Sequence, residues 1–206
     1  MILRCQIVLP AREMAGCQLQ SGAIIEFMNP RAPRAGNGTD RTAFAVLLAA
    51  LAMLGPFSID TYMPSFPEIG RTFGASAFEL QFTISAFLAT FAVMALFHGA
   101  LADSYGRRPI ILFNLALFVG ASAGCALAAT FHHLLWFRAL QGLAGGAGLI
   151  VGRAMIRDSF AGDEAQRMMS TVTMIFGLAP AIAPIIGGWL QAWLGWRSVF
   201  AFLTVY

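Results

Sequence analysis

Two long apolar stretches joined by a short polar turn constrain this chain more than any other feature of its sequence. They cover about residues 77–102 and 109–131, and neither contains an arginine or a lysine. Each is longer than the roughly 20 residues that a helix needs to cross the hydrocarbon core of a bilayer. We therefore expect the segment that joins them, Gly99 to Pro109, to lie at a membrane surface.

The composition supports an integral membrane protein. Of the 206 residues, 58% are hydrophobic and 11% are charged, whereas charged residues make up about a quarter of a soluble domain. The absence of lysine excludes a P-loop lysine and a Schiff-base lysine. Cys5, Cys17 and Cys125 lack the paired spacing of a zinc site or a disulfide framework. We predict that the chain is not an enzyme and has no metal site, no cofactor and no nucleic-acid partner, since its arginines cluster at the ends of apolar runs.

The apolar runs predict an all-α membrane fold. The short alternating segments of a membrane β-barrel are absent from the sequence. Ser76 followed by Glu79 forms a capping box before the second run, and Asp163 is suited to cap the fifth. A sixth run stops after about nine residues, roughly half of a bilayer core. This predicts a fragment of a longer protein, with a short interfacial helix as the alternative. The predicted complete spans cover about residues 43–66, 77–102, 109–131, 132–153 and 166–194, with a partial sixth over 198–206.

The first 41 residues differ in composition from the rest. Charged residues are mixed into short apolar pieces, and a stretch rich in proline and glycine follows. The sequence therefore predicts two parts: a disordered cytoplasmic extension over residues 1–41, in which Met28 is an alternative start, and a transmembrane region over residues 42–206.

Arginine placement predicts the orientation. Only Arg71 and Arg197 fall on one side of the predicted spans, and eight arginines fall on the other. By the positive-inside rule, the side with eight arginines, and with it the N-terminus, is cytoplasmic. These eight are Arg31, Arg34, Arg41, Arg107, Arg108, Arg153, Arg157 and Arg167.

Two charged residues, one acidic and one basic, lie well inside predicted spans rather than at their ends. Asp60 and Arg138 each lie about six residues from the same membrane surface, roughly 9 Å deep, so we expect them to meet or to share a cavity. Charged groups within spans are costly and mark ion or substrate paths. An aspartate near an arginine is suited to load and release a proton, and Tyr62 is close enough to line the same cavity. The alternatives are a structural Arg138 satisfied by carbonyls and an Asp60 wetted by outer water.

Glycine and proline set apart the fourth and fifth spans. In the fourth, the glycines between Gly142 and Gly152 predict close helix packing. In the fifth, two prolines four residues apart weaken the helical hydrogen bonding and predict a bend or hinge. The residues of this predicted hinge are Gly177, Pro180, Pro184, Gly187 and Gly188.

The turn after the second span carries charges that oppose their own helix dipoles. Asp103 lies at a helix C-terminus, while Arg107 and Arg108 lie at a helix N-terminus, at a cost of about 0.3–1 kcal/mol each. We expect an arginine to pair with Asp103 across the turn, and a second helix end, outside this chain, to supply the remaining partner. With Gly99 and Gly106, these residues form a predicted conformational latch. Positive-inside anchoring is the alternative for the arginines.

The chain resembles the major facilitator superfamily, and within it the drug:proton antiporters of the Bcr/CflA type. The resemblance covers about residues 43–206 and implies the N-terminal six-helix half of a twelve-helix protein. It implies a proton-coupling role for Arg138, beside Gln141 in the helix-four motif. Ala183, Thr90 and Ala95 depart from the pattern. The matching residues are Asp60, Tyr62, Pro64, Pro67, Gly99, Leu101, Ala102, Asp103, Gly106, Arg107, Arg108, Arg138, Gln141, Gly142, Arg157, Asp158, Pro184, Gly187 and Gly188.

These observations predict a proton-coupled efflux antiporter of drugs or other small molecules that works by alternating access. We expect a multi-pass protein of the bacterial cytoplasmic (inner) membrane, driven by the proton gradient without a cofactor. Its expected partners are the bilayer, a small-molecule substrate and a missing C-terminal half or partner chain, without which it is inactive. The alternatives are an exporter of a metabolite such as an amino acid or nucleoside, and a non-transporting remnant or a half-transporter that needs a partner.

Overall fold

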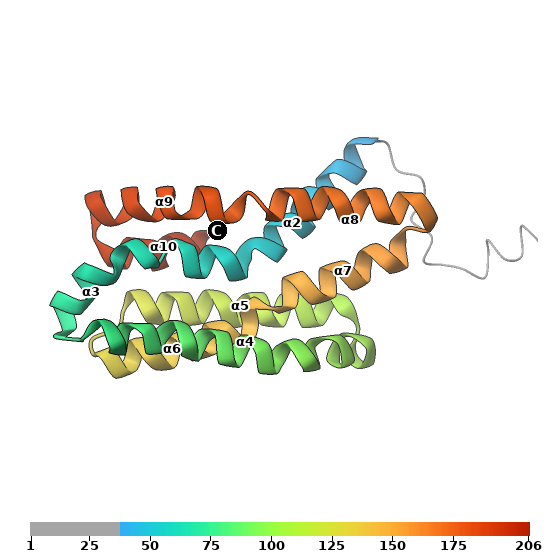
Figure 1. Ribbon diagram of the computed structural model, residues 1–206. Helices are drawn as coiled ribbons and strands as arrows, with labels where there is room; N and C mark the ends of the chain where they lie inside the picture. The colour runs from blue at the N-terminus through green and yellow to red at the C-terminus, as the bar shows by residue number, and fades with distance from the viewer. Residues whose placement is uncertain (1–37) are drawn as a thin grey trace, which may run out of the picture.

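The computed structural model describes residues 38–206, with side chains from residue 44 onward, as helices that run mostly along one axis (Figure 1). No strand occurs within that range. The predicted extension up to residue 37, with Met28, lies outside the described residues. The elements in chain order are α2 (Gly38–Asp60), η1 (Met63–Ser65), α3 (Phe66–Phe73), α4 (Ala77–Tyr105), α5 (Arg107–Ala126), α6 (Phe131–Gly145), α7 (Ala147–Ser159), α8 (Gly162–Phe176), α9 (Ala179–Leu194) and α10 (Trp196–Val205).

Five helical stretches are long and apolar enough to cross a membrane. This confirms the all-α membrane fold with five complete spans, and α10 is a shorter apolar helix after them. The first span continues beyond residue 66 through η1 and α3, and the third begins two residues before Pro109. The spans are Phe44–Phe73, Ala77–Tyr105, Arg107–Ala126, Phe131–Ser159 and Gly162–Leu194.

Local signals explain where the helices start. Ser76 and Glu79 form the predicted capping box of α4, because the Ser76 hydroxyl accepts from the Glu79 N–H and the Glu79 carboxylate accepts from the Ser76 N–H. The prediction that Asp163 caps the fifth span is wrong. The helix α8 already starts at Gly162, with Ala161 as its N-cap, so Asp163 lies inside the first turn, where its charge still favours the helix dipole.

Three of the spans are interrupted. The first breaks after Asp60, the fourth at Gly146 and the fifth at Gly177. The breaks of the fourth and fifth spans lie near the middle of the bundle (Figure 1). In the fifth, Pro180 has no N–H to donate to the Phe176 carbonyl, so the helix stops and restarts as α9. The break therefore lies within the predicted hinge.

Glycines allow neighbouring helices to approach very closely. A Cβ atom on Gly142 would overlap the Phe87 carbonyl of α4, and one on Gly148 would overlap the Leu51 carbonyl of α2. The close packing predicted for the fourth span is therefore present at these two glycines. Gly187 of α9 lies equally close to the Thr61 backbone, so the fifth span packs directly on the break in the first.

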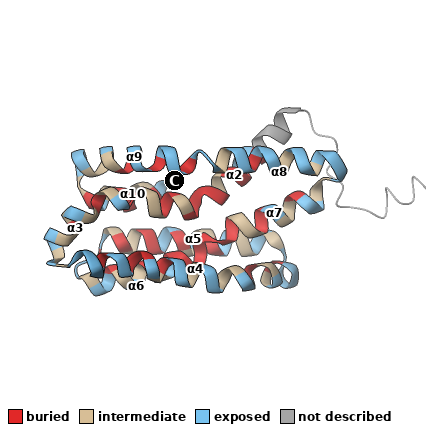
Figure 2. Cartoon of the chain, viewed as in Figure 1, coloured by how far each residue is buried: buried red, intermediate tan, exposed pale blue. Residues whose placement is uncertain are grey.

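Burial separates an inner and an outer surface (Figure 2). The largest fully buried side chains include Tyr62, Phe87 and Phe200, which line the bundle interior. Large apolar side chains such as Trp189 and Trp193 remain exposed. An exposed apolar surface of this kind is suited to contact with lipid rather than water.

Candidate functional site

A polar network surrounds Arg138 in the bundle interior. The side chain is fully buried on α6, and its Nη1 donates to the Ser58 carbonyl of α2 at 3.0 Å and to Gln141 Oε1 at 2.8 Å. Gln141 Nε2 donates in turn to the Ser122 hydroxyl of α5 at 2.7 Å. This network joins three spans. Its centre is a cation bound by neutral groups.

Aromatic rings enclose the rest of the guanidinium. Its Cζ lies 4.3 Å from the centre of the Tyr62 ring, 4.9 Å from Phe87 and 5.9 Å from Phe200. Arg138 Nε and Nη2 have no hydrogen-bond partner among the residues that the structure describes. Cation–π contacts are stronger when the cation is desolvated, and they substitute here for a carboxylate. The arginine is therefore sealed from solvent on the side of these rings.

Asp60 lies apart from this network. It ends α2 and lines a pocket of about 380 Å³, whose other lining residues are apolar. Among the described residues, no ion pair joins Asp60 to Arg138. The two groups nevertheless act on the same helix end, since Arg138 binds the carbonyl of Ser58, two residues before Asp60. The pocket is lined by Ala52, Gly55, Pro56, Ile59, Asp60, Phe87, Leu88, Phe91, Leu149 and Phe176.

Tyr62 belongs to the Arg138 network and not to the lining of the Asp60 pocket. Its side chain is fully buried, and its hydroxyl lies 3.0 Å from the Thr83 hydroxyl of α4. The helix α2 ends at Asp60, and Tyr62 lies in the turn that follows, so helical spacing does not bring the two side chains to one face. The sequence predicted one cavity for Asp60 and Tyr62, but Tyr62 is not among the residues that line the Asp60 pocket.

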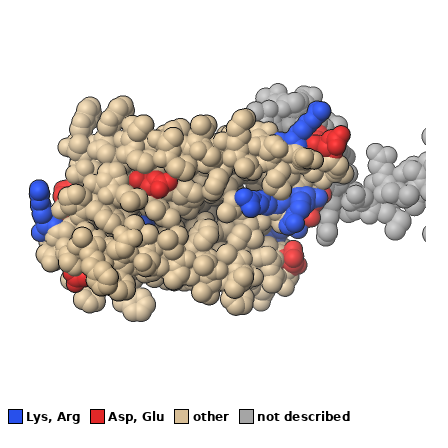
Figure 3. Space-filling view, viewed as in Figure 1, with Lys and Arg blue, Asp and Glu red and all other residues tan. Residues whose placement is uncertain are grey.

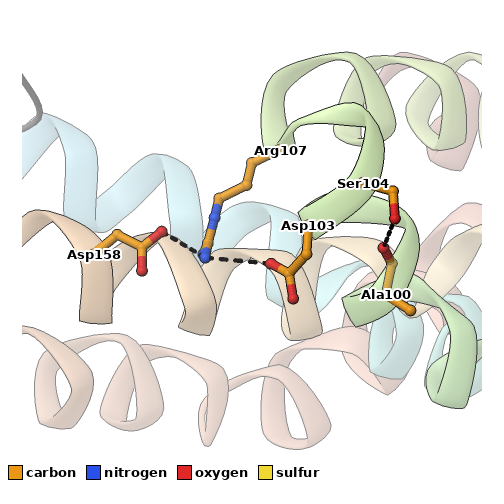
Figure 4. Close-up of polar contacts among 5 residues, drawn as sticks. All are labelled: Ala100, Asp103, Ser104, Arg107 and Asp158. Atoms are coloured by element: carbon orange, nitrogen blue, oxygen red, sulfur yellow. Dashed lines mark hydrogen bonds and ion pairs between the residues drawn. The ribbon is translucent and has the colours of Figure 1, made fainter.

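A second charged cluster lies at one end of the bundle, where Figure 3 shows most of the charged side chains. Arg107 Nη2 lies 3.7 Å from Asp103 Oδ1 and 2.5 Å from Asp158 Oδ2 (Figure 4). The predicted pairing of an arginine with Asp103 is confirmed. The expectation that the second partner lies outside this chain is wrong for Arg107, because α7 ends beside the turn and supplies Asp158.

The backbone of this turn depends on one glycine. Gly106 joins α4 to α5 with a φ of 91°, a conformation that a residue with a Cβ rarely adopts. The cluster borders a pocket of about 480 Å³ that also touches Met155. Arg108 is exposed, with no ion pair among the described residues, and nothing lies within 4 Å of a Cβ built on Gly99. In the structure, Asp103, Gly106 and Arg107 therefore lie together in one cluster. Gly99 and Arg108 are not part of it.

The predicted hinge residues occupy different places. Gly177 caps the end of α8, Pro180 lies in the first turn of α9, and Pro184 lies within α9. Gly187 is buried against Thr61, whereas Gly188 has open space beside it. The break and the close packing are features of the structure. Movement about the break stays a prediction.

The residue pattern alone did not identify several residues of these two sites. Asp158 entered only through the family resemblance, although an acidic residue beside Arg157 at the end of a span is a readable signal of a charged cluster. Ser58, Thr83 and Ser122 gave no signal, since single hydroxyl residues are common in membrane spans. No group of three or more metal-binding side chains occurs in the part of the chain that the structure describes.

Comparison with known proteins gives consistent results. Residues 46–206 match the model of the Major Facilitator Superfamily. The chain is 39% identical over 170 residues to an uncharacterized MFS-type transporter, YdgK, of Bacillus subtilis, which covers 82% of this chain and 42% of the relative. It is 37% identical to a bicyclomycin resistance protein homolog of Haemophilus influenzae, over 79% of this chain and 41% of the relative.

Two further relatives carry drug-resistance names. A chloramphenicol resistance protein of Pseudomonas aeruginosa is 33% identical over 78% of this chain and 39% of the relative, and the multidrug resistance protein MdtL of Klebsiella pneumoniae is 34% identical over 79% and 42%. The chain thus spans about two fifths of the length of these relatives. It is a multi-pass membrane protein of a transporter family, not an enzyme, and it belongs to the Major Facilitator Superfamily.

Proposed function

We propose that this chain forms the N-terminal half of a drug-efflux antiporter that exchanges its substrate for protons. The observation that carries the proposal is the pocket at Asp60, where a single carboxylate lies among apolar and aromatic side chains. Aromatic walls suit hydrophobic drugs, and the carboxylate supplies the one group in the pocket lining that changes charge. The drug-resistance names of the relatives support the same substrate class.

The carboxylate supplies the coupling. An ionised Asp60 in an apolar pocket is costly unless a proton or a cationic group neutralises it. Proton and cationic substrate then compete for the same oxygen atoms, and binding of one releases the other. A neutral substrate couples to the proton through the shape of the pocket instead.

Arg138, Gln141 and Tyr62 do not line the Asp60 pocket but contact the end of α2, or one another, beside it. The Arg138 cation binds a carbonyl in the last turn of α2, where positive charge is favourable. Gln141 and the Tyr62 ring hold the guanidinium in place. We assign these residues to proton coupling, as positioning groups for Asp60 and not as contacts to the substrate.

The remaining predicted elements have roles in alternating access. Asp103 and Arg107, with Asp158, latch the basic end of the bundle, and the span-five break between α8 and α9 acts as the hinge. The basic end is the cytoplasmic side, which places the N-terminus in the cytoplasm of a bacterial cell with the protein in its inner membrane. The substrate path is completed by a C-terminal half or a partner chain, and the present chain alone does not transport.

Proton release on drug binding tests the proposal. Ethidium, a hydrophobic cation, is added to the purified chain in weakly buffered detergent containing a pH indicator. The expected result is saturable binding with release of close to one proton per site in the wild type. Asp60→Asn should abolish the release, and Asp60→Glu should retain it. The matched control is Glu79→Gln, which removes an exposed acid at the start of α4.

Three results would contradict parts of the proposal. Equal proton release from wild type and Asp60→Asn would remove Asp60 from the coupling site. Drug efflux from vesicles that contain only this chain would overturn the claim that a second half is required. Saturable binding of an amino acid or nucleoside, with no binding of ethidium, would favour the metabolite exporter.

A further inference from the structure

His98 is a buried titratable group that the proposed transport cycle does not use. It lies on α4, seven residues before the end of that helix at Tyr105, and its side chain is fully buried. Its Nε2 lies 3.1 Å from Asn114 Oδ1 of α5. Its other ring nitrogen, Nδ1, is buried and has no hydrogen-bond partner within residues 38–206.

The neighbouring asparagine fixes the tautomer of the ring. Asn114 Nδ2 donates to the Ile110 carbonyl at 2.9 Å, so the Oδ1 atom of the same amide faces His98. An amide oxygen only accepts hydrogen bonds, and His98 Nε2 must therefore carry the proton. In the neutral ring, Nδ1 is then an unprotonated acceptor with no donor.

The unpartnered nitrogen faces the break in the fourth span. A Cβ built on Gly146 would lie 3.6 Å from His98 Nδ1. At this break the Gly146 N–H bonds to the Ala144 carbonyl, two residues back, instead of the Gly142 carbonyl that an uninterrupted helix would use. The last turn of a helix generally has carbonyls without partners inside the helix. By this general rule, the carbonyls at the end of α6 are the candidate acceptors beside His98.

Protonation of His98 would convert Nδ1 from an acceptor into a donor. A buried N–H without an acceptor is costly, and the N–H of an imidazolium is more costly still. A rearrangement of the break that turns a carbonyl toward Nδ1 removes this cost. Proton binding and the shape of the break are then linked, because the proton binds more tightly to the rearranged state.

We infer that His98 is a second proton-binding site, separate from Asp60, and that its occupancy selects between two conformations of the α6–α7 break. Acid favours the state in which a carbonyl of the break accepts from Nδ1. The inference depends on the His98, Asn114 and Gly146 geometry and is independent of the role proposed for Asp60.

Charged groups lie on α4 to α7, the helices that surround His98. Within the described chain, none of them forms an ion pair or hydrogen bond with His98. Most of them lie near helix ends. Arg153 lies in the middle of α7 with an exposed side chain, and Arg138 is held eight residues from Gly146 by Ser58 and Gln141. The charged residues of α4 to α7 are Glu79, Asp103, Arg107, Arg108, Arg138, Arg153, Arg157 and Asp158, and the other histidines of these helices are His132 and His133.

Distance measurements across the break test the inference. Spin labels are attached to Trp136→Cys on α6 and Arg153→Cys on α7, both exposed positions, separated by about 25 Å along a helix. The background carries Cys5→Ser, Cys17→Ser and Cys125→Ala. Two distance populations are expected in the wild type, with a ratio that changes by up to about tenfold per pH unit. His98→Gln keeps a donor for Asn114 but does not titrate, and it should remove the pH dependence.

A second measurement keeps the inference testable if His98→Gln does not fold. In the wild type with ¹⁵N-labelled histidine, NMR should show three ring titrations, and one should be missing from His98→Asn. The matched control is His133→Gln, which should leave the distance change intact. A pH-independent distance in the wild type, an equal response in His98→Gln, or a His98 ring signal that does not change with pH would each overturn the inference.

Discussion

Arg138 and Arg107 occupy opposite environments in one bundle. Arg138 is fully buried and binds a backbone carbonyl, an amide and aromatic rings. Arg107 keeps 24% of its side-chain surface exposed and contacts the carboxylates Asp103 and Asp158. The comparison separates two uses of the same side chain. A cation held by neutral groups is a lasting part of the structure, whereas an ion pair whose carboxylates are half or more exposed is exchanged at little cost with water and with other partners.

Truncation of Arg138 should have the largest effect on stability. Arg138→Ala leaves the Ser58 carbonyl and the Gln141 amide oxygen unpaired and opens a cavity between Tyr62 and Phe87. We expect the free energy of unfolding to fall by at least about 3 kcal/mol, measured by thermal melting in detergent. Arg107→Ala is the control and should cost less than about 1 kcal/mol. Equal losses for the two variants would erase the contrast between the regions.

Replacement of Gln141 sharpens the comparison. Gln141→Leu removes one hydrogen bond from a buried cation and another to Ser122, and it should cost about 2 kcal/mol. Gln141→Glu instead gives Arg138 a carboxylate partner like those of Arg107, and it should be the more stable of the two variants. Melting curves of both variants decide the point. A Glu variant that melts below the Leu variant would show that the site rejects a second charge.

Removal of the Asp158 charge should have a smaller effect. Asp158→Asn breaks the 2.5 Å ion pair between α5 and α7, in which the Asp158 side chain is half exposed. We expect a loss of up to about 1 kcal/mol at low salt that decreases at high salt, since salt screens exposed charges. Melting temperatures of wild type and variant, measured across a salt series, give the loss at low salt and its decrease at high salt. A loss that does not change with salt would place this pair with the buried network instead.

The Asp103 substitution should have the smallest effect. Asp103→Asn removes a carboxylate that is 72% exposed and lies 3.7 Å from Arg107. The change in unfolding free energy should stay within about 0.5 kcal/mol. A double-mutant cycle with Asp158→Asn measures whether the two acids share Arg107. A large effect of Asp103→Asn alone would indicate that the turn, rather than the contact with α7, stabilises this end.

The sequence predicts the spans well because each depends on composition over about twenty residues. It also predicts the capping box at Ser76 and the break near Pro180, both of which are local. It does not predict the separation of Asp60 from Arg138, because the depth of a residue along a helix says nothing about the direction in which its side chain points. The sequence does not predict the Arg107–Asp158 contact for a similar reason, since this contact depends on how α7 packs beside the turn after α4.

The break at Gly177 restricts what can cover the outer face of the fifth span. Gly177 and Leu178 are exposed in this chain, and Pro180 leaves the nearby Phe176 carbonyl without its helical donor. Hydrocarbon offers no hydrogen bonds to such a peptide group, so non-helical backbone at membrane depth is tolerated only beside water or protein. The α8–α9 junction is therefore unsuited to face lipid. A water-filled space or an apposed protein surface must lie there whenever the chain is in a bilayer.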